Sequence, residues 1–279
     1  MSAAPTPPPR HIGAGHGLKW LLEALRTVRR WPGTFLVMGF IMAVISLVPY
    51  LGGFAILFLG PALLAGIVTA ADTAWRGGTP ATHQLFTMFQ ETAQRNEALK
   101  LCLPLVVGKL VAFMVLVVAV FRIMARRGMD VHTLEGHPEK ALVLFTDSSM
   151  PGWLALALAI VLLAWTFTAL AIPRVALRSE TAFVAMGESF RRVWRSIGAW
   201  IVVAVLLFAG LVLLMTLLML TQVMAVMQLG LYTVLYAVLG PLLHAAWRDL
   251  DGHVDASDKD DRAPPPPPAP PPPSGILEA

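Results

Sequence analysis

Long apolar blocks separated by short polar segments dominate this 279-residue chain. Blocks such as 35–48 and 201–220 approach or reach the roughly 20 apolar residues that a helix needs to cross the hydrocarbon core of a bilayer. The pattern predicts an all-α membrane protein with about six transmembrane helices. The expected spans are residues 34–48, 54–75, 99–121, 153–172, 197–220 and 223–247.

Amphipathic segments precede the first, third and fifth of these spans. In residues 15–31, leucines recur at helical spacing on one face, charged side chains occupy another, and Trp20 suits headgroup depth. Residues 81–95 and 179–196 show a similar pattern. We therefore expect three hairpins, each preceded by a cytoplasmic amphipathic helix.

Both ends of the chain differ from the membrane domain, which we expect over residues 15–250. Residues 1–14 are rich in alanine and proline, and residues 251–279 are acidic and then almost pure proline. Such segments bury too little apolar surface to fold, so we predict two disordered tails, the second with polyproline II character.

Composition supports the membrane assignment and narrows the chemistry. Hydrophobic residues make up 57% of the chain and charged residues 14%, against roughly 45–50% and 25% in soluble domains. The net charge of +4 forms no basic stripe with interleaved aromatics, so we expect no nucleic-acid partner. Cys102 is the single cysteine, which excludes an internal disulfide or a cysteine metal cluster.

Lysine and arginine residues fall mostly on one side of the predicted spans. By the positive-inside rule that side is cytoplasmic, so we expect both termini in the cytoplasm. The predicted outer loop, residues 122–151, is the exception, because it carries Arg122, Arg126, Arg127 and Lys140.

An internal repeat relates the first and last surface segments. Sliding the chain along itself superposes Glu23 on Glu188, Arg26 on Arg191, Val28 on Val193, Arg30 on Arg195 and Gly33 on Gly198. In each copy a surface helix runs to a glycine and turns into a span, in the same orientation. Shared interfacial constraints without common ancestry remain an alternative.

The stretch Ser179–Val193 contains an Ala-x3-Ser-aromatic pattern before a span, at Ala185, Ser189 and Phe190. It resembles uncharacterised bacterial polytopic inner-membrane families, similar to the membrane domain attached to some glycerophosphoryl diester phosphodiesterases. Residues 17–53 and 246–250 fit the same kind of family. The resemblance implies the architecture and a location in a bacterial inner membrane, and it carries over no catalytic residue.

Few residues offer candidate chemistry. Lys109, near the middle of the third span, either pairs with Asp72 or lines a polar cavity, or else its side chain extends to the interface. A loop with His132, Glu135, His137 and Glu139 has metal-binding residue types, but its spacing matches no zinc signature and a solvated loop is favoured. We find no nucleophile elbow, phosphate loop or paired catalytic carboxylates, so we expect no enzyme and no cofactor.

The preferred function is therefore non-enzymatic. We expect the surface helices to engage membrane lipids, with anionic headgroups as candidates, or to organise a membrane partner. A small permease with Lys109 in its path is the alternative, and a lipid-acting enzyme is a third. The candidate lipid-contacting residues are Arg26, Arg29, Arg30, Arg191, Arg192 and Arg195.

Overall fold

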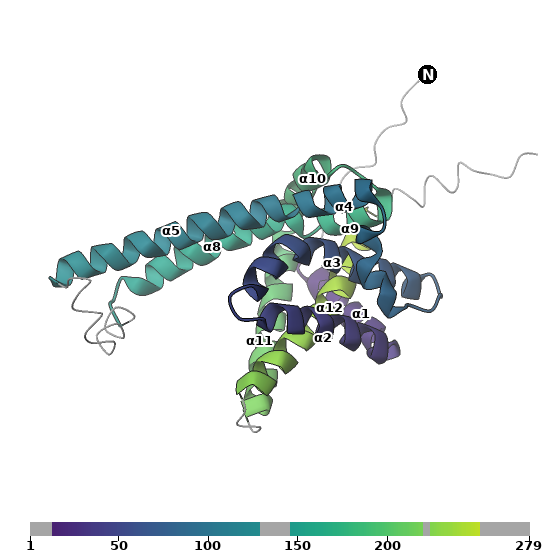
Figure 1. Ribbon diagram of the computed structural model, residues 1–279, viewed down its shortest axis with the longest axis horizontal. Coiled ribbons are helices and arrows are strands. Elements are labelled where there is room, and N and C mark those ends of the chain that lie inside the picture. The colour runs from purple at the N-terminus through teal and green to yellow at the C-terminus, as the bar shows by residue number, and fades with distance from the viewer. Residues whose placement is uncertain (1–12, 129–145, 220–223, 252–279) are drawn as a thin grey trace, which may run out of the picture.

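The computed structural model describes residues 13–128, 146–219 and 224–251, and every regular element in these ranges is a helix (Figure 1). The elements are α1 (Gly15–Arg30), α2 (Pro32–Leu47), α3 (Gly52–Trp75), the 3-10 helix η1 (Thr82–Phe89), α4 (Thr92–Lys100), α5 (Cys102–Arg127), α8 (Met150–Thr168), α9 (Ala171–Arg178), α10 (Ala182–Arg195), α11 (Ile197–Leu218) and α12 (Met224–Asp251).

Five helical stretches of the described chain are long and apolar enough to cross a membrane. They indicate a multi-pass membrane protein and confirm the all-helical class. The first predicted span, 34–48, is missing from these five; it corresponds to α2, which has only 16 residues. It reaches the required length only together with α1, across a bend of 104°. The five stretches are Gly52–Trp75, Thr92–Arg127, Met150–Arg178, Ile197–Leu218 and Val226–Asp251.

The core forms where α12 lies along α2 and crosses α3. Glycines allow these helices to approach closely: a Cβ added at Gly39 of α2 would fall on the Thr233 carbonyl oxygen, and one at Gly240 of α12 would fall on Ile67 of α3. α9 packs on the other side of α3. Most of α3 beyond Gly60 is consequently buried.

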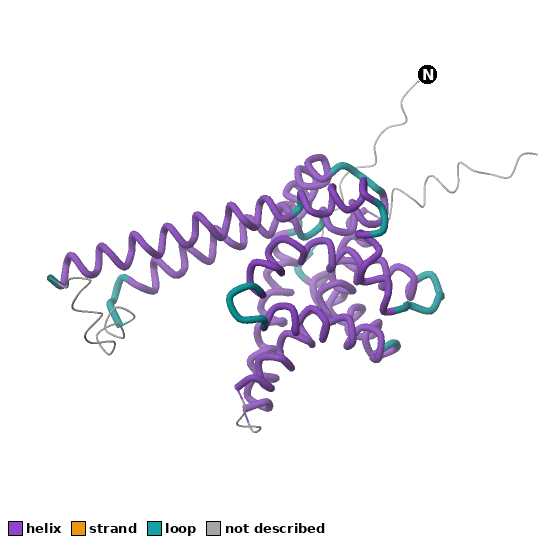
Figure 2. The backbone as a smooth tube through the Cα atoms, viewed as in Figure 1, coloured by secondary structure: helices purple, strands orange, loops and turns teal. Residues whose placement is uncertain are grey.

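α5 and α8 run side by side away from this core (Figure 2). Gly108 packs against Ala164 between them, whereas their outer faces expose large apolar side chains such as Phe113 and Leu158. α11 is exposed along most of its length as well, and only Ala199 and Val203 are buried. Apolar helices of this kind, exposed to solvent in the isolated chain, suit a lipid environment.

The predicted surface helix over residues 81–95 is wrong. The segment instead forms η1 and the start of α4, and its Leu85 and Met88 are buried in the core. The reason is Gly66 of α3, which has no side chain and lets the η1 backbone lie directly on α3. The Gln84 side chain fixes this arrangement by donating to the Thr73 hydroxyl at 2.9 Å.

Helix ends coincide in the two proposed repeat units. α1 ends at Arg30 and α2 begins at Pro32, while α10 ends at Arg195 and α11 begins at Ile197, so one residue separates the helices in each unit. The C-terminal boundary differs from the prediction, because α12 continues to Asp251. The predicted tails lie almost wholly outside the described residues.

Candidate functional site

The C-terminal two turns of α12 carry four ionisable side chains that together bind α1, α3, α9 and α10. We call residues 244–251 the α12 terminal cluster. Its ionisable members are His244, Arg248, Asp249 and Asp251. Each finds a partner on another helix, so the end of α12 ties the surface helices α1 and α10 to the core.

His244 binds Asp72 of α3, with 3.3 Å between its Nε2 and Asp72 Oδ1. Asp72 Oδ2 also accepts a hydrogen bond of 2.7 Å from Arg76 Nε. The His244 ring lies between the indole rings of Trp75 and Trp247, at centroid distances of 6.2 and 6.0 Å. Both partners are buried, so His244 is a core residue.

Arg248 and Asp249 hold α1 against α12. Arg248 forms an ion pair with Glu23, and its guanidinium lies 4.7 Å from the centroid of the Trp75 ring. Asp249 Oδ2 accepts a hydrogen bond of 2.8 Å from Trp20 Nε1. It also lies 2.7 Å from Nδ1 of His16.

Trp20, which the sequence pattern suits to headgroup depth, is 1% exposed, so its ring contacts protein rather than headgroups. Its ring lies 5.5 Å from that of Trp200 on α11. The indole N–H explains the difference: a buried tryptophan needs an acceptor, and Asp249 supplies one. Trp20 therefore connects α1 with α11 and α12.

Asp251 joins α12 to α9 and α10. Its Oδ2 accepts a hydrogen bond of 3.0 Å from Arg174 Nη1, and its other oxygen pairs with Arg192. Arg174 also donates to Glu180 through Nε at 2.8 Å. The side chains of Asp251 and Arg174 are only 1% and 8% exposed, so each charge depends on its partners to offset the loss of hydration.

The structure separates the six candidate arginines into two groups. Arg192 belongs to the ion pairs around Asp251 and also donates to the Leu250 carbonyl at 2.7 Å. Arg191 is exposed and pairs with Glu188 at 2.7 Å. The other four are exposed and have no partner among the described residues; they are Arg26, Arg29, Arg30 and Arg195.

Lys109 is exposed on α5 and has no partner in the described part of the chain. Of the alternatives for Lys109, the pairing with Asp72 does not form, because Asp72 binds Arg76 and His244 instead. The loop that holds His132, Glu135, His137 and Glu139 lies outside the described residues. Within them, no group of three metal-ligating side chains occurs.

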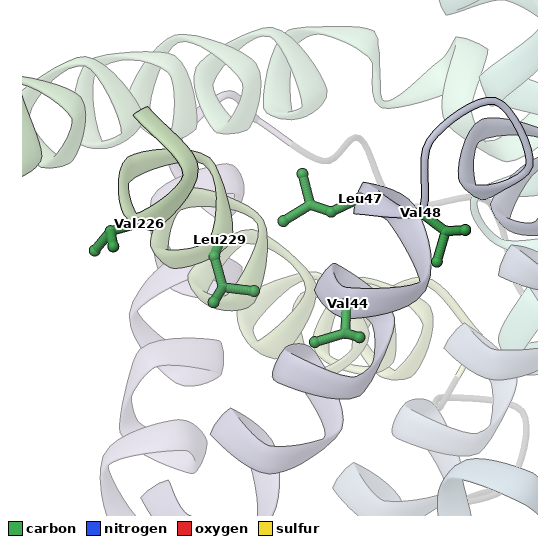
Figure 3. Close-up of a pocket in the computed structure, with 5 residues that line it drawn as sticks. All are labelled: Val44, Leu47, Val48, Val226 and Leu229. Carbon is green, nitrogen blue, oxygen red and sulfur yellow. The ribbon is translucent and has the colours of Figure 1, made fainter. Parts of the chain in front are cut away.

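One groove, of about 340 Å³, lies between the end of α2 and the start of α12. Figure 3 shows its five lining residues, all aliphatic: Val44, Leu47, Val48, Val226 and Leu229. Aliphatic side chains supply neither a nucleophile nor a general acid or base. The groove therefore offers no chemistry of its own.

The α12 terminal cluster was not predicted from the sequence, although a signal for it exists. Asp72-Thr73-Ala74-Trp75-Arg76 and His244-Ala245-Ala246-Trp247-Arg248 share the same spacing of an ionisable residue, tryptophan and arginine. In a helix this spacing puts the first and last members one turn apart on one face. Two such segments on apolar helices indicate a polar contact between them.

Comparisons of the chain with protein-family models, curated proteins and solved structures found no match. The resemblance to membrane domains of glycerophosphoryl diester phosphodiesterases therefore stays a prediction from sequence.

Proposed function

We propose that this chain is a non-enzymatic multi-pass inner-membrane protein whose cytoplasmic surface helix α1 engages anionic lipid headgroups. The proposal rests on one observation, which is that Arg26, Arg29 and Arg30 have no partner among the described residues. They stand exposed on a helix whose opposite face is fixed to the core, and no described acidic residue neutralises them.

Three faces of α1 support this function. Gly17, Trp20, Leu21 and Ala24 form the buried face. Beside it runs an exposed leucine stripe, at the i, i+4 and i+7 positions of one helix face, formed by Leu18, Leu22 and Leu25. Lys19, Arg26 and Arg30 follow on the far side of the leucines. An apolar stripe next to a basic one is the arrangement of a helix lying in the headgroup region.

The leucine stripe is also next to the lipid-facing surface of α11. Gly17 of α1 packs directly on the Ala199 backbone of α11, and Leu21 packs in the same cluster as Val203. The leucines lie just beyond this contact, on the side away from Asp249. Lipid that surrounds α11 would therefore meet Leu18 and Leu22 as well.

Anionic lipid attracts each nearby basic residue by about 1 kcal/mol, and the effect falls off within a Debye length. Three unpaired arginines on one helix supply a preference that salt weakens. Arg126 and Arg127, at the C-terminal end of α5, instead form ion pairs with Asp147, at 3.8 and 3.1 Å.

Lys109 gives no support to the permease alternative. It lies on the exposed surface of α5, and the groove between α2 and α12 contains no polar lining residue. A transport path needs polar groups that face a protein interior.

The proposal is tested by native mass spectrometry of the purified protein with phosphatidylglycerol and phosphatidylcholine. The wild type should retain more phosphatidylglycerol, and the triple variant Arg26→Gln, Arg29→Gln, Arg30→Gln should lose that excess. The matched control is Arg122→Gln, Arg126→Gln, Arg127→Gln, which removes the same charge from the far end of α5. Equal losses in both variants would contradict a lipid site on α1.

A further inference from the structure

The outward face of α10 carries aromatic rings. Phe183 is 63% exposed and Trp194 62% exposed. With Phe190 between them, they occupy one face at the i, i+7 and i+11 positions. Met186 and Val193, which the sequence pattern places on the same side, are buried against the core instead. The outward face of α10 is therefore an aromatic stripe, defined by Phe183, Phe190 and Trp194.

The arginines next to this stripe are mostly neutralised within the chain. Arg191 pairs with Glu188 at 2.7 Å, and Arg192 pairs with the buried carboxylate of Asp251. Arg195 alone stays exposed without a described partner. Charge attraction to a membrane is consequently much weaker on α10 than on α1, although the two helices occupy equivalent places in the repeat.

The aromatic stripe continues an apolar surface of α8. Phe167 of α8 stacks on Phe190 with 4.6 Å between ring centroids, and Phe190 stacks on Trp194 at 6.0 Å. One turn before Phe167, Leu163 is exposed on the outer face of α8. α8 belongs to a stretch that is apolar enough to cross a membrane, so the row of rings leads from a lipid-facing helix onto α10.

We propose that α10 is an aromatic membrane anchor whose stripe inserts at the boundary between headgroups and acyl chains, whatever the headgroup charge. The two surface helices then bind the bilayer by different chemistry, charge for α1 and apolar burial for α10. Tryptophan and phenylalanine suit this depth because their rings are largely apolar, and the indole N–H of Trp194 reaches the headgroups. The inference rests on the membrane placement in the proposed function.

The test uses the full chain with a nitroxide label in lipid bilayers. Cys102, the one cysteine of the sequence, is replaced by serine, and single cysteines are introduced by Phe183→Cys, Trp194→Cys and, as the control, Arg195→Cys. Arg195 follows Trp194 directly and is also exposed, but it points about 100° around the helix. Collisions with oxygen report lipid, and collisions with a water-soluble nickel chelate report water.

Labels at 183 and 194 should show an oxygen-to-nickel accessibility ratio several-fold above that at 195. The ratio should be the same in pure phosphatidylcholine and with phosphatidylglycerol added. A ratio at 194 no higher than at 195 would overturn the anchor. Low access to both reagents would overturn it too and indicate a protein partner. Absence of a phosphatidylglycerol preference in the wild type, with the ratio at 194 still high, would contradict the function of α1 alone, so the two failures are distinguishable.

Discussion

The carboxylate of Asp251 accepts a hydrogen bond of 3.0 Å from Nη1 of Arg174, although 77 positions separate the two residues in the sequence. This contact connects the last described turn of α12 with α9, and through Arg192 also with α10. The orientation of a surface helix thus depends on a buried charge at the end of a core helix.

Asp251→Asn should destabilise the protein strongly. The change leaves two arginines without their shared carboxylate in a buried site, and the loss of one partner of a buried pair costs about 3–5 kcal/mol. Thermal unfolding in detergent, followed by intrinsic fluorescence, measures the effect. The control Arg191→Gln removes an exposed pair with Glu188 and should cost only about 0–1 kcal/mol. Similar losses for both would show that the Asp251 site is not structural.

Gly39→Ala should also lower stability, because its new Cβ would fall on the Thr233 carbonyl oxygen of α12. Overpacking of this kind costs about 1–3 kcal/mol. Gly210→Ala in α11 is the control, since no neighbouring atom lies within 4 Å of its Cβ position. It should be neutral or slightly stabilising in the same unfolding assay. A neutral Gly39→Ala would contradict the close crossing of α2 and α12.

The sequence predicted the helical class and most of the apolar helices because a membrane span is a local property of about 20 residues. It failed at residues 81–95. Their pattern resembles an amphipathic helix, yet Leu85 faces a neighbouring helix instead of lipid. Burial against Gly66 of α3 is a tertiary contact, which periodicity alone does not reveal.

The candidate arginines show the same difference between what the sequence predicts and what only the fold reveals. Their position at helix ends is visible in the sequence, but their availability is not. Arg192 and Arg195 are three residues apart on one helix, and only the fold shows that Asp251 engages the first and leaves the second exposed. Partners that lie far apart along the chain can be identified only after the helices are placed.

Acid should release the Asp147 contacts that join the start of α8 to the end of α5. The pKa of Asp147 is lowered to about 2 by hydrogen bonds from the Ser149 hydroxyl and backbone N–H and from Arg127. Because this value lies below the ordinary 3.8, the carboxylate stabilises the folded chain above pH 3.8 and loses that effect as the pH falls through 2. A spin label at Gly152 should therefore become mobile only in strong acid.

In Asp147→Asn the Gly152 label should be mobile at every pH, since no carboxylate remains to titrate. Glu188→Gln removes a carboxylate from α10 and serves as the control, with the pH profile of the wild type. An unchanged profile in Asp147→Asn would assign the acid effect to another group.

Impermeant maleimide labelling tests the orientation. In the Cys102→Ser background, a cysteine at Arg126 should react from outside intact cells or spheroplasts, whereas one at Arg26 should react only after the membrane is opened. The expectation follows from the positive-inside rule, because most lysine and arginine residues fall on the side of Arg26. Reaction of the Arg26→Cys protein from outside would reverse the proposed topology.

The most direct measurement of the central claim uses spin-labelled lipids around the full chain in bilayers. The motionally restricted fraction should be larger for labelled phosphatidylglycerol than for labelled phosphatidylcholine, and the difference should shrink as salt rises. The triple variant Arg26→Gln, Arg29→Gln, Arg30→Gln should remove most of the difference. Two results would contradict the assignment of α1 as the anionic-lipid surface. One is a preference for phosphatidylglycerol that is as large in this variant as in the wild type, and the other is a wild-type preference that does not respond to salt.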